Sequence, residues 1–314
     1  MKILTHWDAD GIISASKVLE VIDGEVYIPR IGTWRFEAIP REALKGTLYV
    51  LDYSLPREDW EKVCEMIEDL VIIDHHTGNE APCGKTINPA LRGIEVPACS
   101  LVVSNYFRIP YDWRDAVAIA ADLGDPAGNP FWVKIVKEQR LNEEDIMEAA
   151  ALLNSCYRTL DYECIKEYAY NLRQMELEEV LNDKRLRANR ERARSRLEEY
   201  LRKANCVGRV CLIRGDEDVH LFASALWKRL KRNGVSIVIT INEKMMRIYC
   251  RGDERDYEEA IRRAKQIGLK EVGGKKEVCS AHVTREELPR VIRVLREMKL
   301  LDEFEFLESS VIEH

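Results

Sequence analysis

Short apolar runs alternate with amphipathic stretches along the first 125 residues of the sequence. Each apolar run has the length of a buried strand, and the stretches between the runs have the period of a helix. The expected strands are KILTH (2–6), LYVLD (48–52) and LVIID (70–74). The expected helices cover residues 14–22, 57–69, 97–107 and 113–124. This alternation predicts an α/β fold with a mostly parallel sheet and helices on both of its faces.

The rest of the chain follows a different pattern. Residues 130–205 have helical periodicity throughout, and strand-like segments return only afterwards, at 209–215, 236–240 and 246–252. With 314 residues, the chain is long for a single core and long enough for two domains of ordinary size. We therefore expect a first domain at 1–155, a helical connector at 156–205 and a smaller α/β domain at 206–314.

Every expected strand of the first domain ends in acids or histidines. In chain order these residues are His6, Asp8 and Asp10, then Asp52, and then Asp74, His75 and His76. A further acid, Asp122, stands where a predicted helix gives way to a glycine turn. Ligands of open parallel sheets bind at the carboxyl ends of the strands, so these side chains are expected at one edge of the sheet.

Carboxylates gathered at one edge repel each other, and a bound cation removes that repulsion. Carboxylate and imidazole ligands without thiolates suit Mn²⁺, Mg²⁺, Fe²⁺ or Zn²⁺. Each residue taken alone has a structural explanation, because an aspartate after a strand commonly caps the next helix and a lone buried histidine is commonly a core residue. The structural explanation would have to apply separately to four groups of residues at the same edge of the sheet. The sequence therefore favours a metal site.

Composition narrows the setting. The formal net charge of −7 does not suit a protein that grips a long polyanion, which needs an extended basic track. No apolar stretch approaches the ~20 residues of a membrane span, and the first residues lack the apolar core of a secretory signal, so we expect a cytoplasmic protein without a membrane partner. The nine cysteines form no C-x-x-C pair, and we expect reduced, mostly buried thiols.

Four motifs in the first domain resemble the signature motifs of the DHH phosphoesterase superfamily, which is named for its Asp-His-His triplet. They are HWDADG (6–11), VLDYS (50–54), IDHHT (73–77) and AADLG (120–124). The segment INP (87–89) after the triplet resembles RecJ-like members in particular. The resemblance implies a hydrolase of phosphodiester bonds, with its active site in the cleft between the DHH domain and a DHH-associated C-terminal domain.

The resemblance also implies a two-metal site, most simply with Mn²⁺, and with Mg²⁺ as the other choice. Its six ligands would be His6, Asp8, Asp10, Asp52, His75 and Asp122. His6 and Asp8 would hold one ion, and Asp10, His75 and Asp122 would hold the second. Asp52 would bridge the two ions. Asp52 would also count as catalytic, together with Asp74, which would orient the histidines and fix their tautomers. His76, the third catalytic residue, would face the scissile phosphate.

The segment EVGGKKEVCSAHV (271–283) resembles the Gly-Gly-His segment of the DHH-associated domain, which binds substrate in RecJ-like and nanoRNase members. By this resemblance Gly273 and Gly274 would let backbone N–H groups approach a phosphate. Lys275 stands where the family has histidine, and an ammonium can still serve a phosphate. Arg251, in IYCRG, is similar to the family's strand-end arginine and would meet a phosphate of the nucleotide.

Three functions stay open at this point. The leading one is a 3′–5′ exonuclease or nanoRNase that releases mononucleotides from short RNA or single-stranded DNA. The second is a phosphodiesterase of cyclic di-AMP or linear dinucleotides, or a phosphatase of adenosine bisphosphate. The third is a scaffold without catalysis, whose mark would be lost ligands, and none is lost here. The basic stretch 184–203 could draw in a short strand or be a solvated helix, and the oligomeric state, a homo-oligomer included, is open.

Overall fold

The computed structural model describes residues 1–242, 246–251, 257–269, 272–275 and 278–284, together with 286, 287, 290 and 293. The chain divides into two compact units, Met1–Ala193 and Arg194–His314. Most of the stretch expected to be a connector, 156–205, therefore belongs to the first unit. The end of the predicted C-terminal domain, 294–314, lies outside the described residues.

The first unit contains a five-stranded sheet in the order β2-β1-β3-β4-β5, in which every pairing is parallel. The strands are β1 (Lys2–Thr5), β2 (Glu25–Tyr27), β3 (Thr47–Leu51), β4 (Asp69–Ile73) and β5 (Lys85–Ile87). The predicted α/β class with a parallel sheet is confirmed. The two outer strands were not predicted, because three residues are too few for a periodic signal.

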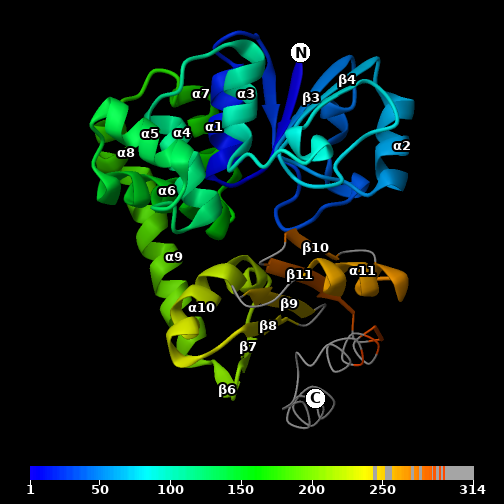
Figure 1. Cartoon of the computed structure of the whole chain (residues 1–314), viewed down its shortest axis with the longest axis vertical. Coiled ribbons are helices and arrows are strands. Elements are labelled where there is room, and N and C mark those ends of the chain that lie inside the picture. Colours follow the sequence, from blue (N-terminus) through cyan, green and yellow to red (C-terminus); the bar gives the residue numbers. More distant parts are fainter. Residues whose placement is uncertain are drawn as a thin grey trace. The chain divides into compact units, whose positions relative to one another are not determined.

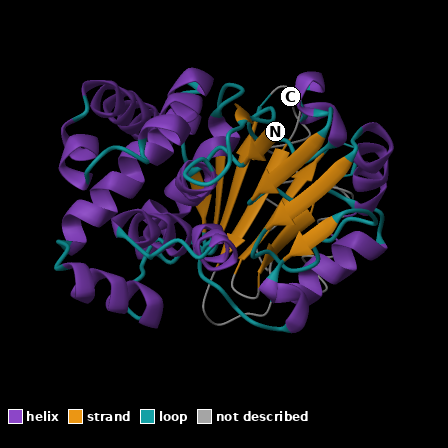
Figure 2. Cartoon of the chain, turned by 90° about the horizontal axis from the view of Figure 1, so that it is seen from above, coloured by secondary structure: helices purple, strands orange, loops and turns teal. Residues whose placement is uncertain are grey.

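Helices cover both faces of this sheet (Figure 1). In order they are α1 (Ala9–Val18), α2 (Arg57–Met66), α3 (Cys99–Phe107), α4 (Trp113–Leu123), α5 (Pro130–Gln139), α6 (Glu143–Arg158), α7 (Tyr162–Asn171) and α8 (Leu177–Asn182). Helices α1 and α3 pack on the central strands, and α2 lies on the opposite side. Helices α4 and α7 pack on α1, α5 and α6 pack on α4, and α8 packs on α6. Figure 2 shows most of the helices gathered to one side of the strands. Helix α9 (Lys184–Arg202) runs across the boundary between the units.

Helix α1 begins five residues earlier than the sequence pattern predicted. The side chain of Asp8 accepts a hydrogen bond from the backbone N–H of Gly11 at 3.0 Å, which caps the first turn. A Cβ atom on Gly11 would lie 2.2 Å from the carbonyl oxygen of His6. The glycine therefore does not break the helix. It permits the close approach between the first turn of α1 and the end of β1.

The second unit is also α/β, as predicted. Its strands, in the order β10-β11-β9-β8-β7-β6, are antiparallel except for the parallel pair β7 and β8. They are β6 (Asn205–Val207), β7 (Val210–Arg214), β8 (Ile237–Ile241), β9 (Met246–Arg251), β10 (Val272–Lys275) and β11 (Val278–Val283). The helices α10 (Ala223–Leu230) and α11 (Glu258–Gln266) pack against them, and alternate residues of the strands, such as Ile239 and Ile248, form its core.

The expectation of reduced thiols is wrong for six of the nine cysteines. Disulfides join Cys64 to Cys83, Cys156 to Cys164 and Cys206 to Cys211. The other three cysteines, Cys99, Cys250 and Cys279, are buried, as expected. The partners are 5 to 19 residues apart in the sequence, and spacing alone does not reveal which cysteines the fold brings together. Disulfides occur in secreted proteins and inside hyperthermophiles, so they do not decide the compartment.

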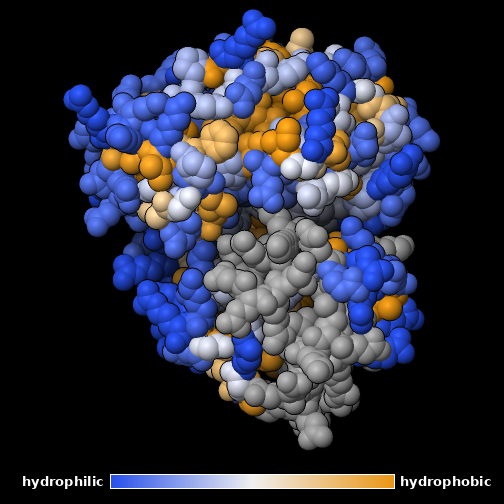
Figure 3. Space-filling view, viewed as in Figure 1, coloured by the Kyte–Doolittle hydropathy of each residue, from blue (hydrophilic) through white to orange (hydrophobic). Residues whose placement is uncertain are grey.

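No described helix has the length and apolar character needed to cross a membrane. The surface of the first unit is largely hydrophilic, although apolar side chains gather over part of the face seen in Figure 3. The most exposed large apolar side chains of the described residues include Ile94 and Val133, at 56% and 45%. We assign no role to them.

Candidate metal centre

The structure brings the acids and histidines of the four motifs together at the carboxyl ends of β1, β3 and β4. Two clusters of three residues each offer ligand atoms that lie within 4.8 Å of one another: His6, Asp8 and Asp52, and Asp10, His75 and Asp122. A third cluster, Asp52, Asp74, His75 and His76, overlaps both. The first two clusters coincide with the ligand sets that the sequence resemblance implied, and their role as ligands stays a prediction.

The first cluster is built by the turn from β1 into α1. His6 Nδ1 lies 3.0 Å from an oxygen of Asp8 and 3.6 Å from Oδ2 of Asp52. Because Asp8 caps α1, its backbone position is fixed by the helix. The imidazole nitrogen therefore faces two carboxylates. In this arrangement all three groups could bind one ion.

The second cluster joins three elements. Asp10 is fully buried, and its two oxygens accept hydrogen bonds from Cys99 N and Ser100 N, at 2.6 and 2.9 Å, where α3 begins. His75 Nε2 lies 3.2 Å from Asp122 Oδ2 and 3.9 Å from Asp10 Oδ2. Asp122 comes from the last turn of α4, a helix that ends at Gly124 with φ 70°. Helix ends, and not only strand ends, thus supply this cluster.

The tautomer of His75 is set by the backbone. Its Nδ1 lies 2.8 Å from the carbonyl oxygen of Val96. A carbonyl can only accept, so Nδ1 carries a proton and donates it. In neutral His75 the lone pair is then on Nε2, which faces the carboxylates of Asp122 and Asp52. This is the tautomer that a metal ligand requires, because an imidazole binds a metal through an unprotonated nitrogen.

Asp52 lies where the two clusters meet, in an unusual backbone conformation. Its φ of 55° is in the left-handed region, which is costly for most residues and is more readily adopted by Asp and Asn. A hydrogen bond from Asp52 N to the carbonyl of Ile73, at 3.1 Å, ties it to the end of β4. The buried oxygen Oδ1 lacks a hydrogen-bond donor of standard geometry among the described residues. A buried carboxylate oxygen without a donor fits a cation ligand.

The electrostatics of the centre also fit a cation. Burial, and then the charge of Asp122, raises the pKa of Asp10 to about 7. Burial and the charges of Asp10 and Asp8 raise the pKa of Asp52 well above its usual value. Burial alone would lower the pKa of His6, but Asp8 raises it above the ordinary value. All three shifts retain protons in the centre, and a divalent cation would replace them.

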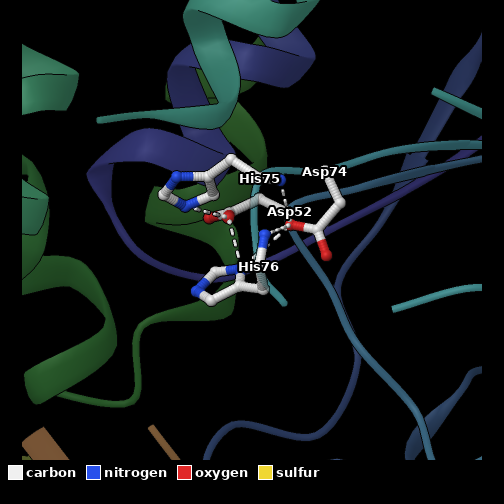
Figure 4. Close-up of side chains that lie close together, drawn as sticks. All are labelled: Asp52, Asp74, His75 and His76. Atoms are coloured by element: carbon white, nitrogen blue, oxygen red, sulfur yellow. Dashed lines mark hydrogen bonds and ion pairs between the residues drawn. The ribbon is translucent and has the colours of Figure 1, made fainter. Parts of the chain in front are cut away.

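Asp74 and His76 lie beside the two clusters (Figure 4). Oδ1 of Asp74 accepts hydrogen bonds from His75 N at 2.7 Å and from His76 Nδ1 at 2.9 Å. Burial alone would raise the pKa of Asp74, but the charge of His76 lowers it to about 2, so the carboxylate is ionised at neutral pH. The side chain of His76 is 40% exposed, and Asp74 fixes which way its ring faces.

Sequence reasoning missed the residues that hold Asp74. Asn79 is fully buried, and its Nδ2 donates to Asp74 Oδ2 at 2.5 Å and to the carbonyl of Tyr53 at 3.1 Å. The indole N–H of Trp60 donates to Asn79 Oδ1 at 3.0 Å. Asn88, in the INP segment, donates to the carbonyl of His76 at 2.8 Å. The INP motif was the one signal in the sequence that pointed to this support.

The predicted substrate residues belong to the other unit. Arg251 ends β9, and Gly273, Gly274 and Lys275 form most of β10. In the register of the sheet, Lys275 and Arg251 are both paired with Val278 of β11. Their part in binding substrate stays a prediction.

Comparison with solved structures decides the fold. The chain is similar to RecJ of Thermus thermophilus in complex with Mn²⁺, with a TM-score of 0.59 and 17% identity over 95% of this chain and 51% of RecJ. A structure described as the DHH domain of a member of a family of ribosomal proteins has a TM-score of 0.66 and 13% identity, over 96% of this chain and 86% of that one. The chain has the DHH phosphoesterase fold.

The Mg²⁺ complex of the same RecJ is similar as well, with a TM-score of 0.52 and 15% identity over 95% of this chain and 49% of RecJ. This chain therefore spans about half the length of RecJ. Neither the family models nor the curated proteins that were compared with the sequence match it. At these identities the likeness establishes the DHH fold, as the sequence motifs predicted, and not the reaction.

Proposed function

We propose that the chain is a metal-dependent phosphodiesterase that hydrolyses short oligonucleotides or dinucleotides to mononucleotides. The observation that carries the proposal is that two clusters of acids and imidazoles meet at one buried carboxylate, Asp52, within the DHH fold. The four motifs that resemble the signature motifs of the superfamily supply every one of these residues. Neither cluster would be needed for folding, because gathering buried carboxylates destabilises a protein unless a cation is bound.

The proposed cofactor is a pair of divalent cations, Mn²⁺ first and Mg²⁺ second; RecJ has been solved with each. His6 and Asp8 would hold one ion, Asp10, His75 and Asp122 the other, and Asp52 both. Such a pair, when bound, lowers the pKa of a water molecule and clamps the attacking and leaving oxygens of an in-line displacement.

The side chains around the ions have their own tasks. Asp74, ionised and held by Asn79, keeps a proton on His76 Nδ1 and leaves the exposed part of that ring towards the substrate. His76 would there donate a hydrogen bond to the phosphate group being cleaved. Val96 keeps the proton of His75 away from the centre. None of these steps needs a covalent intermediate on the protein.

Short substrates agree best with the charge of the chain. A net charge of −7 gives no general attraction for a long polyanion, so we propose a substrate of a few nucleotides. From the sequence resemblance we also propose a 3′–5′ direction of cleavage and substrate contacts through Arg251, Gly273, Gly274 and Lys275. The cytoplasmic location and a homo-oligomer stay predictions from the sequence.

Metal analysis of the purified protein, joined to a substrate panel with Mn²⁺, tests the proposal. We expect bound or readily bound divalent metal and a higher kcat/KM on dinucleotides and short 5-mers than on 20-mers, with mononucleotides as products. Turnover confined to cyclic di-AMP or adenosine bisphosphate would move the function to the second class predicted from the sequence. Bound metal without turnover of any of these compounds would support the scaffold.

Replacing Asn79 with alanine is expected to lower kcat/KM on a dinucleotide about 10–100-fold, the usual effect of removing a residue that holds a metal-site side chain. The reason is that Asp74 loses its 2.5 Å donor, and His76 its fixed orientation. The pH profile of kcat/KM should shift as well, which a purely structural role would not cause. Asn105→Ala, which removes an exposed side chain bonded to Tyr111, is the control, and an unchanged rate and profile in Asn79→Ala would contradict this role.

A further inference from the structure

An aromatic residue from a loop lies beside the metal centre. Trp34 belongs to the segment between β2 and the short 3₁₀ helix η1 (Phe36–Ala38). Its ring centroid lies 6.3 Å from that of His6, with the two planes 29° apart, and 5.2 Å from that of Trp7. Trp7 is buried, whereas Trp34 is partly exposed. The loop thus presents an indole next to a proposed metal ligand.

Both neighbours of Trp34 are anchored in the core. The hydroxyl of Tyr53, the buried residue after Asp52, donates to the carbonyl of Thr33 at 2.7 Å. On the other side the buried carboxylate of Asp59 pairs with Arg35 Nε at 3.0 Å and accepts from Phe36 N at 3.2 Å. A loop held at both sides of one residue fixes the place of that residue, so the indole is preorganised beside the centre.

Packing alone explains this arrangement poorly. The buried indole of Trp7 already packs near Tyr53, with ring centroids 6.0 Å apart. Trp34 adds a second, partly exposed tryptophan at the border of a centre made of acids and imidazoles. Partly exposed aromatic rings beside a charged site are what nucleotide-binding proteins use, because every base has a π-face that can stack on them.

We propose that Trp34 is a stacking platform for a nucleobase of the substrate. The base and phosphate of one nucleotide are joined through a single sugar, so a base on Trp34 would bring its own phosphate to the metal centre. Stacking on an indole accepts any base, and the site would therefore select nucleotides over other phosphate esters without reading sequence. The inference rests on the proposed function and deepens it by naming a base-binding subsite.

Binding of monophosphates isolates this subsite from catalysis. Calorimetric titrations in Mn²⁺ would compare AMP, UMP and ribose 5-phosphate on the wild type, Trp34→Leu and Trp34→Phe. We expect wild type to prefer both nucleotides over ribose 5-phosphate. Trp34→Leu should weaken the nucleotides about 5–150-fold, the cost of losing one stacked base, and leave ribose 5-phosphate unchanged. Trp34→Phe should keep most of the preference.

Phe131→Leu is the control, because Phe131 on α5 is an aromatic side chain that is 38% exposed and lies in none of the clusters described above. Equal affinity of the wild type for AMP and ribose 5-phosphate would overturn the inference, and so would an unchanged preference in Trp34→Leu. A second measurement needs no variant: 2-aminopurine riboside monophosphate loses fluorescence when it stacks. Binding without quenching would therefore also overturn the inference.

The outcomes separate this subsite from the proposed reaction. A wild type that hydrolyses no diester but binds AMP through Trp34 would refute the reaction and leave the base site standing. A wild type that hydrolyses dinucleotides, with Trp34→Leu showing the same KM, would refute the base site and leave the reaction standing. With both correct, KM for dinucleotides rises in Trp34→Leu while kcat changes little, because stacking binds the ground state and the transition state alike.

Discussion

Replacing Asp52 with asparagine is expected to lower kcat/KM on a dinucleotide on the order of 10³-fold or more, and to leave the chain folded. Among the described carboxylates, Asp52 is the one with ion-pair distances to histidines of both clusters, with oxygens 3.6 Å from His6 Nδ1 and 3.5 Å from His75 Nε2. Losing its charge would weaken both proposed ion sites, and the ions are expected to supply several kcal/mol of transition-state stabilisation.

Asparagine is a better test than alanine because of the backbone at this position. At φ 55° asparagine is tolerated, whereas alanine would add about 1–2 kcal/mol of strain that could be mistaken for a catalytic effect. The neutral amide also removes a buried carboxyl group whose ionisation burial, Asp10 and Asp8 oppose. The metal-free variant should therefore melt at the same temperature as the wild type or higher, while its activity is lost. If activity were lost through unfolding instead, the variant would melt at a lower temperature than the wild type.

The measurement joins steady-state kinetics with a thermal melt in EDTA. Asp23→Asn, which neutralises an exposed carboxylate in the turn between α1 and β2, is the control and should change neither quantity. Activity within tenfold of the wild type in Asp52→Asn would contradict the assignment of Asp52 as the shared ligand.

The sequence predicted the fold where its signals are local. The strands around Leu4, Val50 and Ile72 are apolar runs with no polar interruption, because both faces of a parallel sheet are covered, and they were placed within about one residue. The start of α1 was misplaced because Gly11 resembles a helix breaker in one dimension. The close approach of Gly11 to the carbonyl of His6 depends on the folded structure, and the sequence pattern does not show it.

The candidate site divides in the same way. The acids and histidines could be located because motifs at strand ends meet at one edge of a parallel sheet. The residues that hold them could not, since Asn79 reaches back to Asp74 and Trp60, and Val96 reaches His75 across 21 residues. These contacts follow from loop conformation, which has no period in the sequence. Trp34 was missed for the same reason.

Divalent metal is expected to stabilise the protein much more at pH 8 than at pH 5.5. In the metal-free chain the pKa of Asp10 is raised to about 7 by burial and then by Asp122; its other charged neighbours are His75, Asp8 and Asp52. In the unfolded chain an aspartate has a pKa of about 3.9. The folded form therefore binds more protons than the unfolded form across this window, and the stability of the metal-free protein falls as the pH rises from about 4 to about 7.

Metal reverses this trend, because it binds the deprotonated ligands. At pH 8 and a concentration of 100 Kd, Mn²⁺ should add about 2.7 kcal/mol, or about 5–10 °C in Tm for a unit of this size. At pH 5.5 the ion must displace the proton of Asp10, at a cost of about 2 kcal/mol, which leaves a shift of about 2 °C. Melts at both pH values, with and without Mn²⁺, measure the difference, and Asp52→Asn should show only a small shift at either. An equal stabilisation at pH 8 and pH 5.5 would mean that Mn²⁺ binds elsewhere on the chain, since no proton in the centre would then compete with the ion.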